Sequence, residues 1–567
     1  MTGCERWALA LLAIGTAAFL PFALNRFVFP KLVVVGAGVL LASLVPARGR
    51  LPRPAIMIVG LGALCLLVAA LAGAAPVEQL VGGPPRYEGV FVLPVYVGAL
   101  VSGARVLSLG RARGSTSWFL RWLAVAAIAV GVEAVLEATG LRPLASNVSR
   151  PGSLLGNASD EGAWAILVLC PLAAVTVRAG GGLYAAGTLG AAATLVCSGS
   201  RGALVGAAVA AVTLAALMPR RGVRMAIAAG VAAMAVGVFT LPATRSRVTG
   251  ASPLATQTAT GRELLWRETA RLVAAHPLLG VGPSGYVDAI PAYHDRQYEL
   301  EIGPVNPPDS PHDWILQAAA AGGIGLAILA LGLAGLTVLR GVRVTRQQVG
   351  AGETAAVAGM LAGLVGYGVA LLFHLTSPGT TPLAALFAGA LLGAPAGSSP
   401  AGGHVRWARL VQPALAALLV VLAAAAVAEI PLRAAIDDAA RGDFAAANAD
   451  FRLARDLRPW DGDVAAVAAH AYATLATDGI RAAAAEGAGW ITQARAAFPR
   501  STQTLSDAAT IDLTGGDPAG ATRILSTALA HDPTNPVLFR QLELAYRSEG
   551  AAARAAEAAR RAQQLTK

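Results

Sequence analysis

The chain has 567 residues, of which 55% are hydrophobic and only 14% are charged, and its mean hydropathy is +0.60. This composition excludes an ordinary soluble enzyme and an intrinsically disordered protein. A net charge of +11 is compatible with nucleic-acid binding, but the basic excess lies in short clusters between apolar runs. Such clusters set the orientation of membrane helices, so we expect an integral membrane protein that does not bind nucleic acid.

Apolar runs of the length needed to cross a bilayer, about 17–25 residues, recur along most of the chain. We predict an all-α polytopic membrane protein with about 12–13 transmembrane helices in residues 1–428. Residues 430–567 are predicted to form a soluble α-helical repeat domain. The predicted spans lie at residues 7–24, 31–46, 54–75, 89–109, 118–138, 162–178, 181–197, 203–218, 224–241, 312–338, 353–374, 382–396 and 409–428.

The charges of the connecting loops predict how these helices are oriented. Loops on one side carry clusters of arginine, such as Arg220, Arg221 and Arg224, whereas the loops on the other side carry few. Since basic loops remain in the cytoplasm, we expect a multi-pass protein of the cell inner (cytoplasmic) membrane with its N-terminus inside. Residues 242–311 then form a large extracytoplasmic loop, of a length that is uncommon outside functional loops.

Beyond residue 430 the sequence predicts short amphipathic helices separated by turns, for example at residues 444–458 and 518–532. Prolines that follow such helices stand 40 and 34 residues apart, at Pro459, Pro499 and Pro533. A helix-pair repeat of about 34 residues resembles the tetratricopeptide pattern, and such solenoids bind peptides or partner proteins on a concave surface. A plain helical bundle is the alternative. The residues leave open on which side of the membrane this domain lies.

Two arginines stand in segments predicted at the outer membrane face. Ser198-Gly199-Ser200-Arg201-Gly202 predicts a tight turn, in which glycine lets the backbone approach a ligand and Arg201 offers hydrogen-bond donors suited to phosphate. An arginine that anchors a short hairpin at the interface is an equal alternative. Arg262 begins a predicted amphipathic helix that runs to Ala275, and we expect its apolar side to rest on the membrane surface. From the residues alone, Arg262 is more simply explained as a solvated side chain.

His312 stands where the long outer loop re-enters the membrane, next to Asp313. Histidine is the usual proton carrier near neutral pH, which makes His312 a candidate for activating a hydroxyl. The alternative is a histidine at a helix terminus followed by an acidic residue in the first turn, which is favourable helix chemistry by itself. His374 lies at the outer end of another predicted span, where an interfacial position would explain it. The four cysteines have no metal-ligand spacing, and we expect neither a metal nor a cofactor.

Taken in order, these segments resemble the O-antigen ligase and polymerase superfamily of bacterial membrane glycosyltransferases. The resemblance covers roughly residues 85–395 and rests on Arg150-Pro151-Gly152-Ser153, Ser200-Arg201-Gly202, Gly261-Arg262 with Trp266, Pro277-Leu278-Leu279-Gly280-x-Gly282-x-x-Gly285-Tyr286, His312 with Leu316-Gln317, and Gly322-Gly323-Ile324-Gly325. The family usually has Asn after this histidine, where the present chain has Asp313. That carboxylate could orient the imidazole of His312 or raise its pKa.

The resemblance implies a GT-C-like enzyme that transfers a glycan from undecaprenyl diphosphate to an acceptor hydroxyl without a metal. It implies that Arg201 and Arg262 bind the diphosphate, because arginine donors stabilise the charge that develops on the leaving group. Arg150 and Arg86 are further candidates for this role. His312, with Asp313, would activate the acceptor hydroxyl.

The expected partners are the undecaprenyl-diphosphate-linked donor, a lipid- or protein-borne acceptor, membrane lipid, and a protein partner on the repeat domain. An O-antigen or exopolysaccharide polymerase and a protein O-oligosaccharyltransferase of the same superfamily remain alternatives. Outside the enzymes, a transporter of lipid-linked glycans would require charged groups near mid-membrane and inverted repeats, neither of which is evident in the sequence. An assembly scaffold would depend on residues 430–567 and would tolerate the loss of Arg201 and His312.

Overall fold

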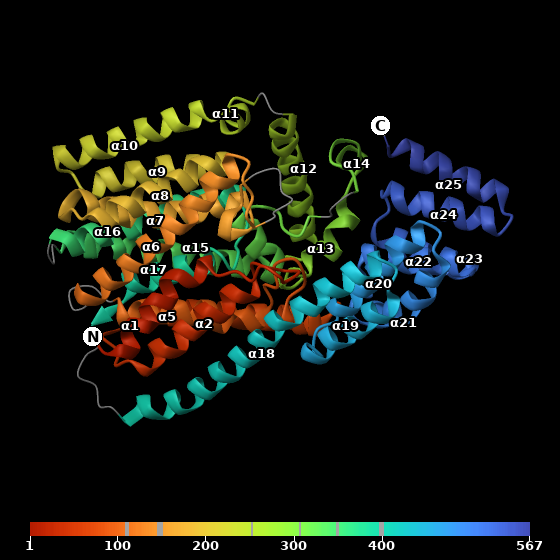
Figure 1. Ribbon diagram of the computed structural model, residues 1–567, viewed down its shortest axis with the longest axis horizontal. Coiled ribbons are helices and arrows are strands. Elements are labelled where there is room, and N and C mark those ends of the chain that lie inside the picture. The colour runs from red at the N-terminus through yellow and green to blue at the C-terminus, as the bar shows by residue number, and fades with distance from the viewer. Residues whose placement is uncertain are drawn as a thin grey trace.

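The computed structural model of the protein describes residues 1–107, 113–144, 151–250, 253–304, 308–347, 351–395 and 402–566 (Figure 1). Within these ranges the regular structure is almost entirely helical. Strands β1 (Gly49–Arg50) and β2 (Ala394–Pro395) have two residues each and pair antiparallel. The predicted all-α class is confirmed.

The first part of the chain forms a bundle of long helices, and each predicted span overlaps one of them. Among the described residues, seven helices are long and apolar enough to cross a membrane, and five shorter helices are apolar. The protein is therefore a multi-pass membrane protein. The bundle consists of α1 (Gly3–Ile14), α2 (Phe29–Leu44), α3 (Arg53–Ala72), α5 (Leu93–Val106), α6 (Arg113–Ala138), α7 (Ala158–Ala179), α8 (Gly182–Ser198), α9 (Arg201–Leu217), α10 (Arg221–Thr240), α15 (Trp314–Arg346), α16 (Ala351–Ala370), α17 (Thr381–Leu392) and α18 (Gly402–Ala440).

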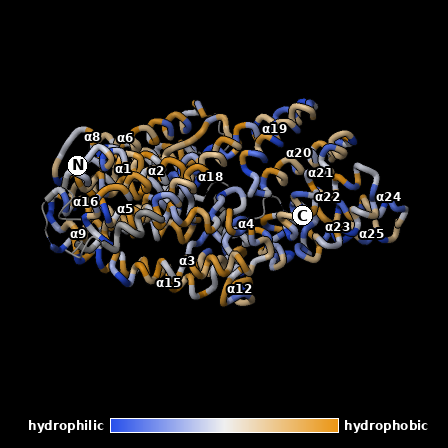
Figure 2. The backbone as a smooth tube through the Cα atoms, turned by 90° about the horizontal axis from the view of Figure 1, so that it is seen from below, coloured by the Kyte–Doolittle hydropathy of each residue, from blue (hydrophilic) through white to orange (hydrophobic). Residues whose placement is uncertain are grey.

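The bundle has central and peripheral helices. In α7 and α16, 67% of the most apolar 18-residue stretch is buried within the protein, whereas the buried share is 22% in α3 and α15 and 11% in α10. Figure 2 shows that the exposed helices α3 and α15 are nevertheless largely hydrophobic. Apolar helices with exposed apolar faces are typical of lipid contact. At the centre, Gly359 of α16 faces Pro171 of α7 so closely that a Cβ would lie 2.4 Å from the proline Cα, and small residues of this kind let membrane helices approach each other.

Residues 242–311, here called the outer loop, fold into a compact unit at one end of the bundle. Leu264, Leu265 and Leu272 form a small core with Tyr286, and Leu272 is fully buried. The apolar side of α12 is thus covered by the rest of the loop, and our prediction that it rests on the membrane surface is wrong. The short helices that follow α12 supply a protein partner for this side. The loop contains α11 (Pro242–Val248), α12 (Pro253–Ala275), α13 (Tyr286–Ala289), η4 (Ile290–Tyr293) and α14 (Arg296–Glu301).

A break in α15 anchors the outer loop to the bundle. At Gly322 and Gly323 the backbone leaves the helical conformation, and Gly323 has a φ of +79°. The freed backbone groups bind the loop, because Ile324 donates to the carbonyl of Pro277 at 2.9 Å and Val281 donates to that of Ala320 at 2.7 Å. A Cβ at Gly323 would lie 2.1 Å from the carbonyl oxygen of Leu278. Two of the glycine-rich motifs in the sequence therefore belong to one close contact between backbones.

Residues 441–566, here called the C-terminal helical region, form antiparallel helices around their own apolar core. The helices predicted at residues 444–458 and 518–532 are confirmed as α19 and α23. Several helices begin at a capping side chain, since Asp443, Ser501, Asp517 and Asn535 each accept from a backbone N–H in the first turn. The tetratricopeptide assignment stays a prediction. The helices are α19 (Phe444–Leu457), α20 (Asp463–Thr477), α21 (Arg481–Ala497), α22 (Thr502–Gly515), α23 (Pro518–His531), α24 (Pro536–Ser548) and α25 (Ala552–Gln564).

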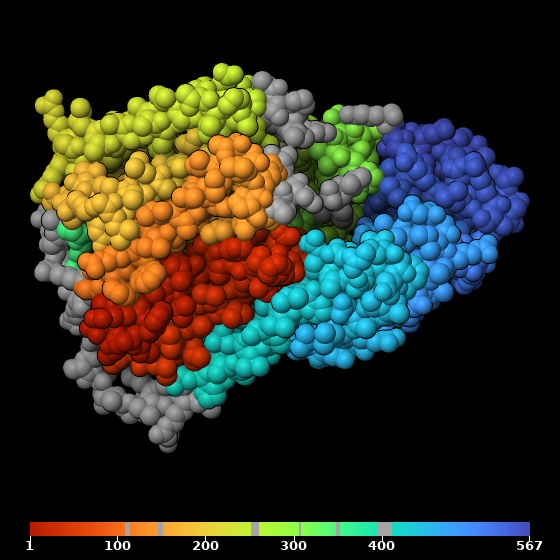
Figure 3. All heavy atoms as spheres, in the orientation of Figure 1, coloured from red at the N-terminus to blue at the C-terminus, as the bar shows by residue number. Residues whose placement is uncertain are grey.

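The C-terminal helical region lies at the same end of the bundle as the outer loop (Figures 1 and 3). Helix α18 leads into it directly. Thr534 donates to the carbonyl of His294 at 3.2 Å, and Arg296 donates to that of Gln564 at 2.9 Å. Whatever side of the membrane the outer loop occupies, this region shares it.

Arg458 forms the joint between the C-terminal helical region and the bundle. Its guanidinium group is fully buried and is paired with Glu429, Asp461 and Asp463 at 2.6, 3.1 and 2.9 Å. The same group lies over the rings of Phe29 and Tyr87, at 5.4 Å from each centroid. A charge taken out of water is tolerated only when it is paired in this way, so the joint holds the two parts in one orientation.

Candidate functional site

A cavity of about 1190 Å³ opens at the end of the bundle that carries the outer loop. Its walls come from the connections between helices that the charge pattern places on the outer side. Segments that are distant in sequence therefore meet at this cavity. From the sequence, only the order of the family-like motifs indicates that they do so. The lining includes residues from the segments 24–28, 84–87, 155–160, 261–265, 308–312 and 375–379.

Three of the predicted site residues, Arg86, Arg262 and His312, line this cavity. The Nε atom of Arg262 is buried and has no hydrogen-bond partner among the described residues. Burial lowers the pKa of Arg262, and the charges of Arg201 and Arg247 lower it further. These three side chains, here called the arginine cluster, thus concentrate positive charge at one side of the cavity. Arg150, the remaining predicted arginine, lies outside the described residues.

The turn before α9 explains how Arg201 and Arg247 approach each other. Gly199 has a φ of +56°, and Ser200 accepts from the backbone N–H of Ala203 at 3.4 Å to cap α9. A Cβ at Gly199 would lie 3.7 Å from Cδ of Arg247, which is an ordinary van der Waals distance. The turn that resembles the family motif therefore lies directly beside Arg247 of α11. No local signal in the sequence distinguishes Arg247, which stands among other arginines of the loop.

Arg86 differs from Arg262 because carboxylates compensate its charge. Its guanidinium group pairs with Glu88 at 3.0 Å and with the Asp309 carboxylate at 3.0 Å, and it donates to the Asp309 carbonyl at 2.7 Å. Burial acts to lower the pKa of Arg86, but the two carboxylates raise it overall. Arg86 therefore holds the segment that leads to His312, rather than standing ready for an anion.

His312 lies in a strained backbone conformation beside a second histidine. Its φ is +53°, which is uncommon for a residue other than glycine, and its backbone N–H donates to Oγ of Ser310 at 3.0 Å. The ring stacks on that of His374 with 6.5 Å between centroids. His374 in turn contacts Asp160 through Nε2 and Oδ1 at 2.9 Å. Sequence reasoning missed this Asp160–His374 pair, because its members come from α7 and from the end of α16.

Burial and the nearby His374 lower the pKa of His312 to about 4, with smaller contributions from Arg262 and Arg86. The imidazole is therefore neutral at neutral pH, and its buried Nδ1 has no hydrogen-bond partner among the described residues. A neutral imidazole with a free nitrogen can accept a proton. The arrangement brings this acceptor to the same cavity as the arginine cluster.

Residues 186–331 match the family model described as O-Antigen ligase. This part of the chain is similar to the domain that defines that family. A search among curated proteins finds no match. The matched segment contains the arginine cluster, His312 and the Gly322-Gly323 break, whereas Arg86, the Asp160–His374 pair and the C-terminal helical region lie outside it.

Within the matched segment, Asp313 caps a helix. Its Oδ1 accepts from the backbone N–H groups of Ile315 and Leu316, at 2.8 and 2.9 Å, and so caps α15. The expectation that Asp313 raises the pKa of His312 is wrong, since that pKa is lowered and Asp313 is not among its causes. The carboxylate is engaged by the helix terminus, where negative charge is favourable.

Trp266 connects α12, which carries Arg262, with the segment that leads to His312. Its indole N–H donates to the carbonyl of Pro311 at 2.9 Å, directly before His312 and one helical turn beyond Arg262. Its ring also packs on Phe373, with 6.1 Å between centroids. Trp266 therefore sets the distance between α12 and the start of α15. Among the described residues, no group of three or more His, Cys, Asp and Glu side chains is arranged to hold a metal ion.

Proposed function

We propose that the protein is a membrane glycosyltransferase of the O-antigen ligase type. It would transfer a glycan from undecaprenyl diphosphate to a hydroxyl group of an acceptor, at the outer face of the cytoplasmic membrane. The observation that carries this proposal is the concentration of positive charge at the arginine cluster, where burial and neighbouring arginines lower the pKa values of Arg262 and Arg247 beside the cavity that His312 lines. A bound anion would stabilise positive charge that is concentrated in this way.

In the proposed reaction the acceptor oxygen attacks the anomeric carbon of the donor sugar. The bond between that carbon and the diphosphate oxygen breaks, and the bonding electrons leave with the diphosphate. Arg201 and Arg262 stabilise the developing negative charge by hydrogen bonds in a partly dehydrated site, where such bonds are strongest. His312 accepts the proton of the attacking hydroxyl group.

Donor binding and proton acceptance are coupled in this arrangement. A base with a pKa of about 4 is weak, and part of its depression comes from Arg262 and Arg86. A bound diphosphate would compensate the charge of Arg262, so it would raise the pKa of His312 towards the range where a general base is effective. His312 then becomes a competent base when the donor is present. Asp160 and His374 act as positioning residues beneath its ring.

Reconstitution in liposomes tests the proposal. Wild-type protein is supplied with an undecaprenyl-diphosphate-linked glycan and with three acceptors in parallel: a lipid-anchored core saccharide, the growing glycan itself, and a Ser/Thr-containing protein. We expect transfer to one acceptor and its loss in Arg201→Ala, Arg262→Ala and His312→Gln. Near-normal transfer in both arginine variants would refute the roles assigned to them. Movement of the donor across the bilayer without transfer would instead favour a transporter.

A further inference from the structure

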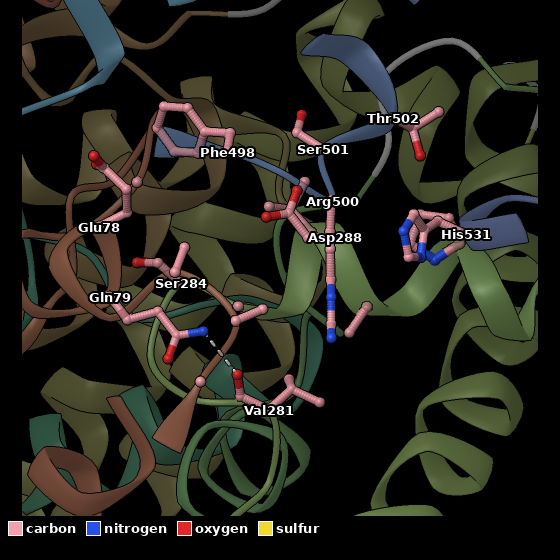
Figure 4. A pocket seen from close by; sticks show the side chains of 18 of the residues that line it. Glu78, Gln79, Val281, Ser284, Asp288, Phe498, Arg500, Ser501, Thr502 and His531 are labelled. Atoms are coloured by element: carbon pink, nitrogen blue, oxygen red, sulfur yellow. Dashed lines mark hydrogen bonds between the residues drawn. The ribbon is translucent and has the colours of Figure 1, made fainter. Parts of the chain in front are cut away.

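A second cavity, of about 790 Å³, lies between the outer loop and the C-terminal helical region (Figure 4). One wall consists of α4 (Pro76–Val81), the segment 276–281 and α13, and the opposite wall comes from α20, the segment 498–504 and His531. Its volume falls within the range of about 300–1,000 Å³ that is typical of ligand sites. This interdomain cavity shares Pro84 and Asp463 with the cavity of the arginine cluster, so the two cavities abut.

Glu78 and Gln79 place two unpaired oxygen atoms in the lining of the interdomain cavity. The two residues are only 6% and 5% exposed. Each is held by one end, since Glu78 Oε1 accepts from the backbone N–H of Gly462 and Gln79 Nε2 donates to the carbonyl of Val281, both at 3.0 Å. The remaining oxygens, Glu78 Oε2 and Gln79 Oε1, have no partner among the described residues. Buried polar atoms are nearly always hydrogen-bonded, so the pair points to a ligand that carries donors.

The opposite wall adds matching groups. The hydroxyl group of Thr502 is likewise buried without a partner, and Phe498 offers an aromatic ring (Figure 4). Asp288 lies near Arg500 in the middle of the cavity, and this arginine limits the rise in the Asp288 pKa that burial causes, to about 6. The interdomain cavity thus presents hydroxyl, amide and carboxyl groups around apolar walls.

The balance of charge decides which kind of ligand fits. Burial and the charge of Asp461 raise the pKa of Glu78 to about 8, so this carboxyl group is uncharged at neutral pH. Asp288 is offset by Arg500, and Asp507 is paired with His470 at 3.1 Å. An anionic diphosphate would need an excess of arginine, as in the arginine cluster, and a basic peptide would need an excess of carboxylate. Neither excess exists here, and a neutral molecule rich in hydroxyl groups meets both the donors and the acceptors.

We propose that the interdomain cavity binds sugar residues of a substrate glycan that lie beyond the bond that reacts. This inference rests on the proposed function, which brings a glycan to the adjoining cavity. The glycan belongs either to the acceptor or to the donor, and both present the same neutral, hydroxyl-rich chemistry. The C-terminal helical region would then contribute to substrate selection by closing the site.

A binding experiment on the full-length protein in nanodiscs tests this site. The probes are a core oligosaccharide of acceptor type, the free oligosaccharide of the donor, and undecaprenyl diphosphate without sugar. Ala292 lines the cavity and is exposed, so Ala292→Trp fills space without disturbing a core. Ala553→Trp on the exposed face of α25, away from the cavity, is the matched control. We expect Ala292→Trp to weaken binding of one or both oligosaccharides at least about tenfold, and the control to bind as the wild type does.

Thr502→Val provides a second variant that keeps the shape of the side chain. Loss of one hydrogen bond predicts affinity weaker by about three- to tenfold. Undecaprenyl diphosphate should bind normally to both variants and weakly to Arg262→Ala, which separates this site from the proposed catalytic one. The oligosaccharide that loses affinity identifies the source of the glycan. Equal oligosaccharide binding by Ala292→Trp and Ala553→Trp, or no oligosaccharide binding by the wild type, would overturn the proposal.

Discussion

Arg458 and Arg262 are both withdrawn from solvent at the outer end of the bundle, but their electrostatic surroundings are opposite. Arg458 has three carboxylates within 3.1 Å and two aromatic faces, and its pKa is raised well above the ordinary value by those carboxylates although burial opposes them. Arg262 has other arginines as its charged neighbours, and its pKa is lowered. Arg458 completes a structural joint, whereas the positive charge of Arg262 would be stabilised by an anionic ligand.

The contrast predicts that charge compensation, more than burial, distinguishes structural arginines from those that we propose to bind a ligand. Arg86 illustrates the point, because it lies in the same cavity as Arg262 but is paired with Glu88 and Asp309. Burial alone would place Arg86 with the diphosphate ligands. Its ion pairs place it with Arg458, as a residue that holds the backbone in position.

Replacement of Arg458 should have the largest effect on stability. Arg458→Met leaves Glu429, Asp461 and Asp463 buried without their cation, and breaking a buried ion pair from one side costs about 3–5 kcal/mol. We expect a large fall in the thermal unfolding midpoint of the C-terminal helical region, measured by differential scanning calorimetry in detergent. Arg452→Ala, at an exposed arginine of α19, the helix directly before Arg458, should change little. An unaltered midpoint in Arg458→Met would show that the joint is not held by charge.

Replacement of Arg262 should reverse this pattern and affect activity instead of stability. Removal of one donor that stabilises transition-state charge lowers rates by about 10²–10³-fold in other enzymes, and we expect a comparable fall in kcat/KM for Arg262→Ala. The thermal midpoint should stay unchanged or rise, because a repulsive contact is removed. Arg267→Ala is the matched control, since this exposed arginine of α12 is paired with Asp295. A destabilised but active Arg262→Ala would place Arg262 with Arg458.

Much of the bundle follows from hydropathy, because a membrane helix must satisfy its backbone internally and shows as one apolar run. Each predicted span overlaps an observed helix, including α10 and α15. The order of motifs also predicted that Arg262 and His312 lie at one site, and both line the same cavity. What the sequence could not supply is the partner of each polar group. Asp160 with His374 and Arg86 with Asp309 are separated by more than 200 positions, and only the packing of helices makes them neighbours.

The errors have the same origin. The apolar side of α12 was predicted to face lipid because its sequence pattern does not reveal that η4 and α14 cover it. Asp313 was assigned to His312 as its neighbour in sequence, yet the start of α15 takes its carboxylate as a cap. Amphipathicity and adjacency indicate which groups need partners, and the tertiary structure decides which partners they obtain.

The backbone contact at Gly323 should give the next effect, because it fixes the outer loop without any charge. In Gly323→Ala a Cβ would lie 2.1 Å from the Leu278 carbonyl oxygen at a φ of +79°, and such strain costs about 1–3 kcal/mol. We expect a lower unfolding midpoint and faster hydrogen exchange at residues 277–281. At Gly325 of the same helix a Cβ meets nothing within 4 Å, so Gly325→Ala should be neutral or slightly stabilising. Equal effects of both substitutions would contradict the anchoring role.

The joint around Arg458 should also depend on pH. Glu78 has a pKa raised to about 8 by burial and by Asp461, above its ordinary value of 4.5. A group whose pKa is raised by folding stabilises the native state most at low pH, and this contribution is lost as pH rises from about 4.5 to 8. We expect the unfolding free energy to fall progressively over this interval. In Glu78→Gln this part of the slope should disappear, and a persistent slope would assign it to Asp461 instead.

Replacement of Arg247 should have the smallest effect on activity, and it tests the comparison between Arg458 and Arg262 most directly. It belongs to the arginine cluster, but it is only partly buried, and its pKa is lowered by burial and then by Arg201. A charge at the rim of a site attracts an anionic ligand without touching the reacting bond, so its removal should raise KM about three- to tenfold and leave kcat nearly constant. Because salt screens such attraction, the difference from wild type should shrink as ionic strength increases. Arg245→Gln on the exposed face of α11 should show neither effect. If Arg247→Gln lowers kcat as strongly as Arg262→Ala does, then all three arginines contact the leaving group directly, and partial exposure does not separate binding from catalysis in this cluster.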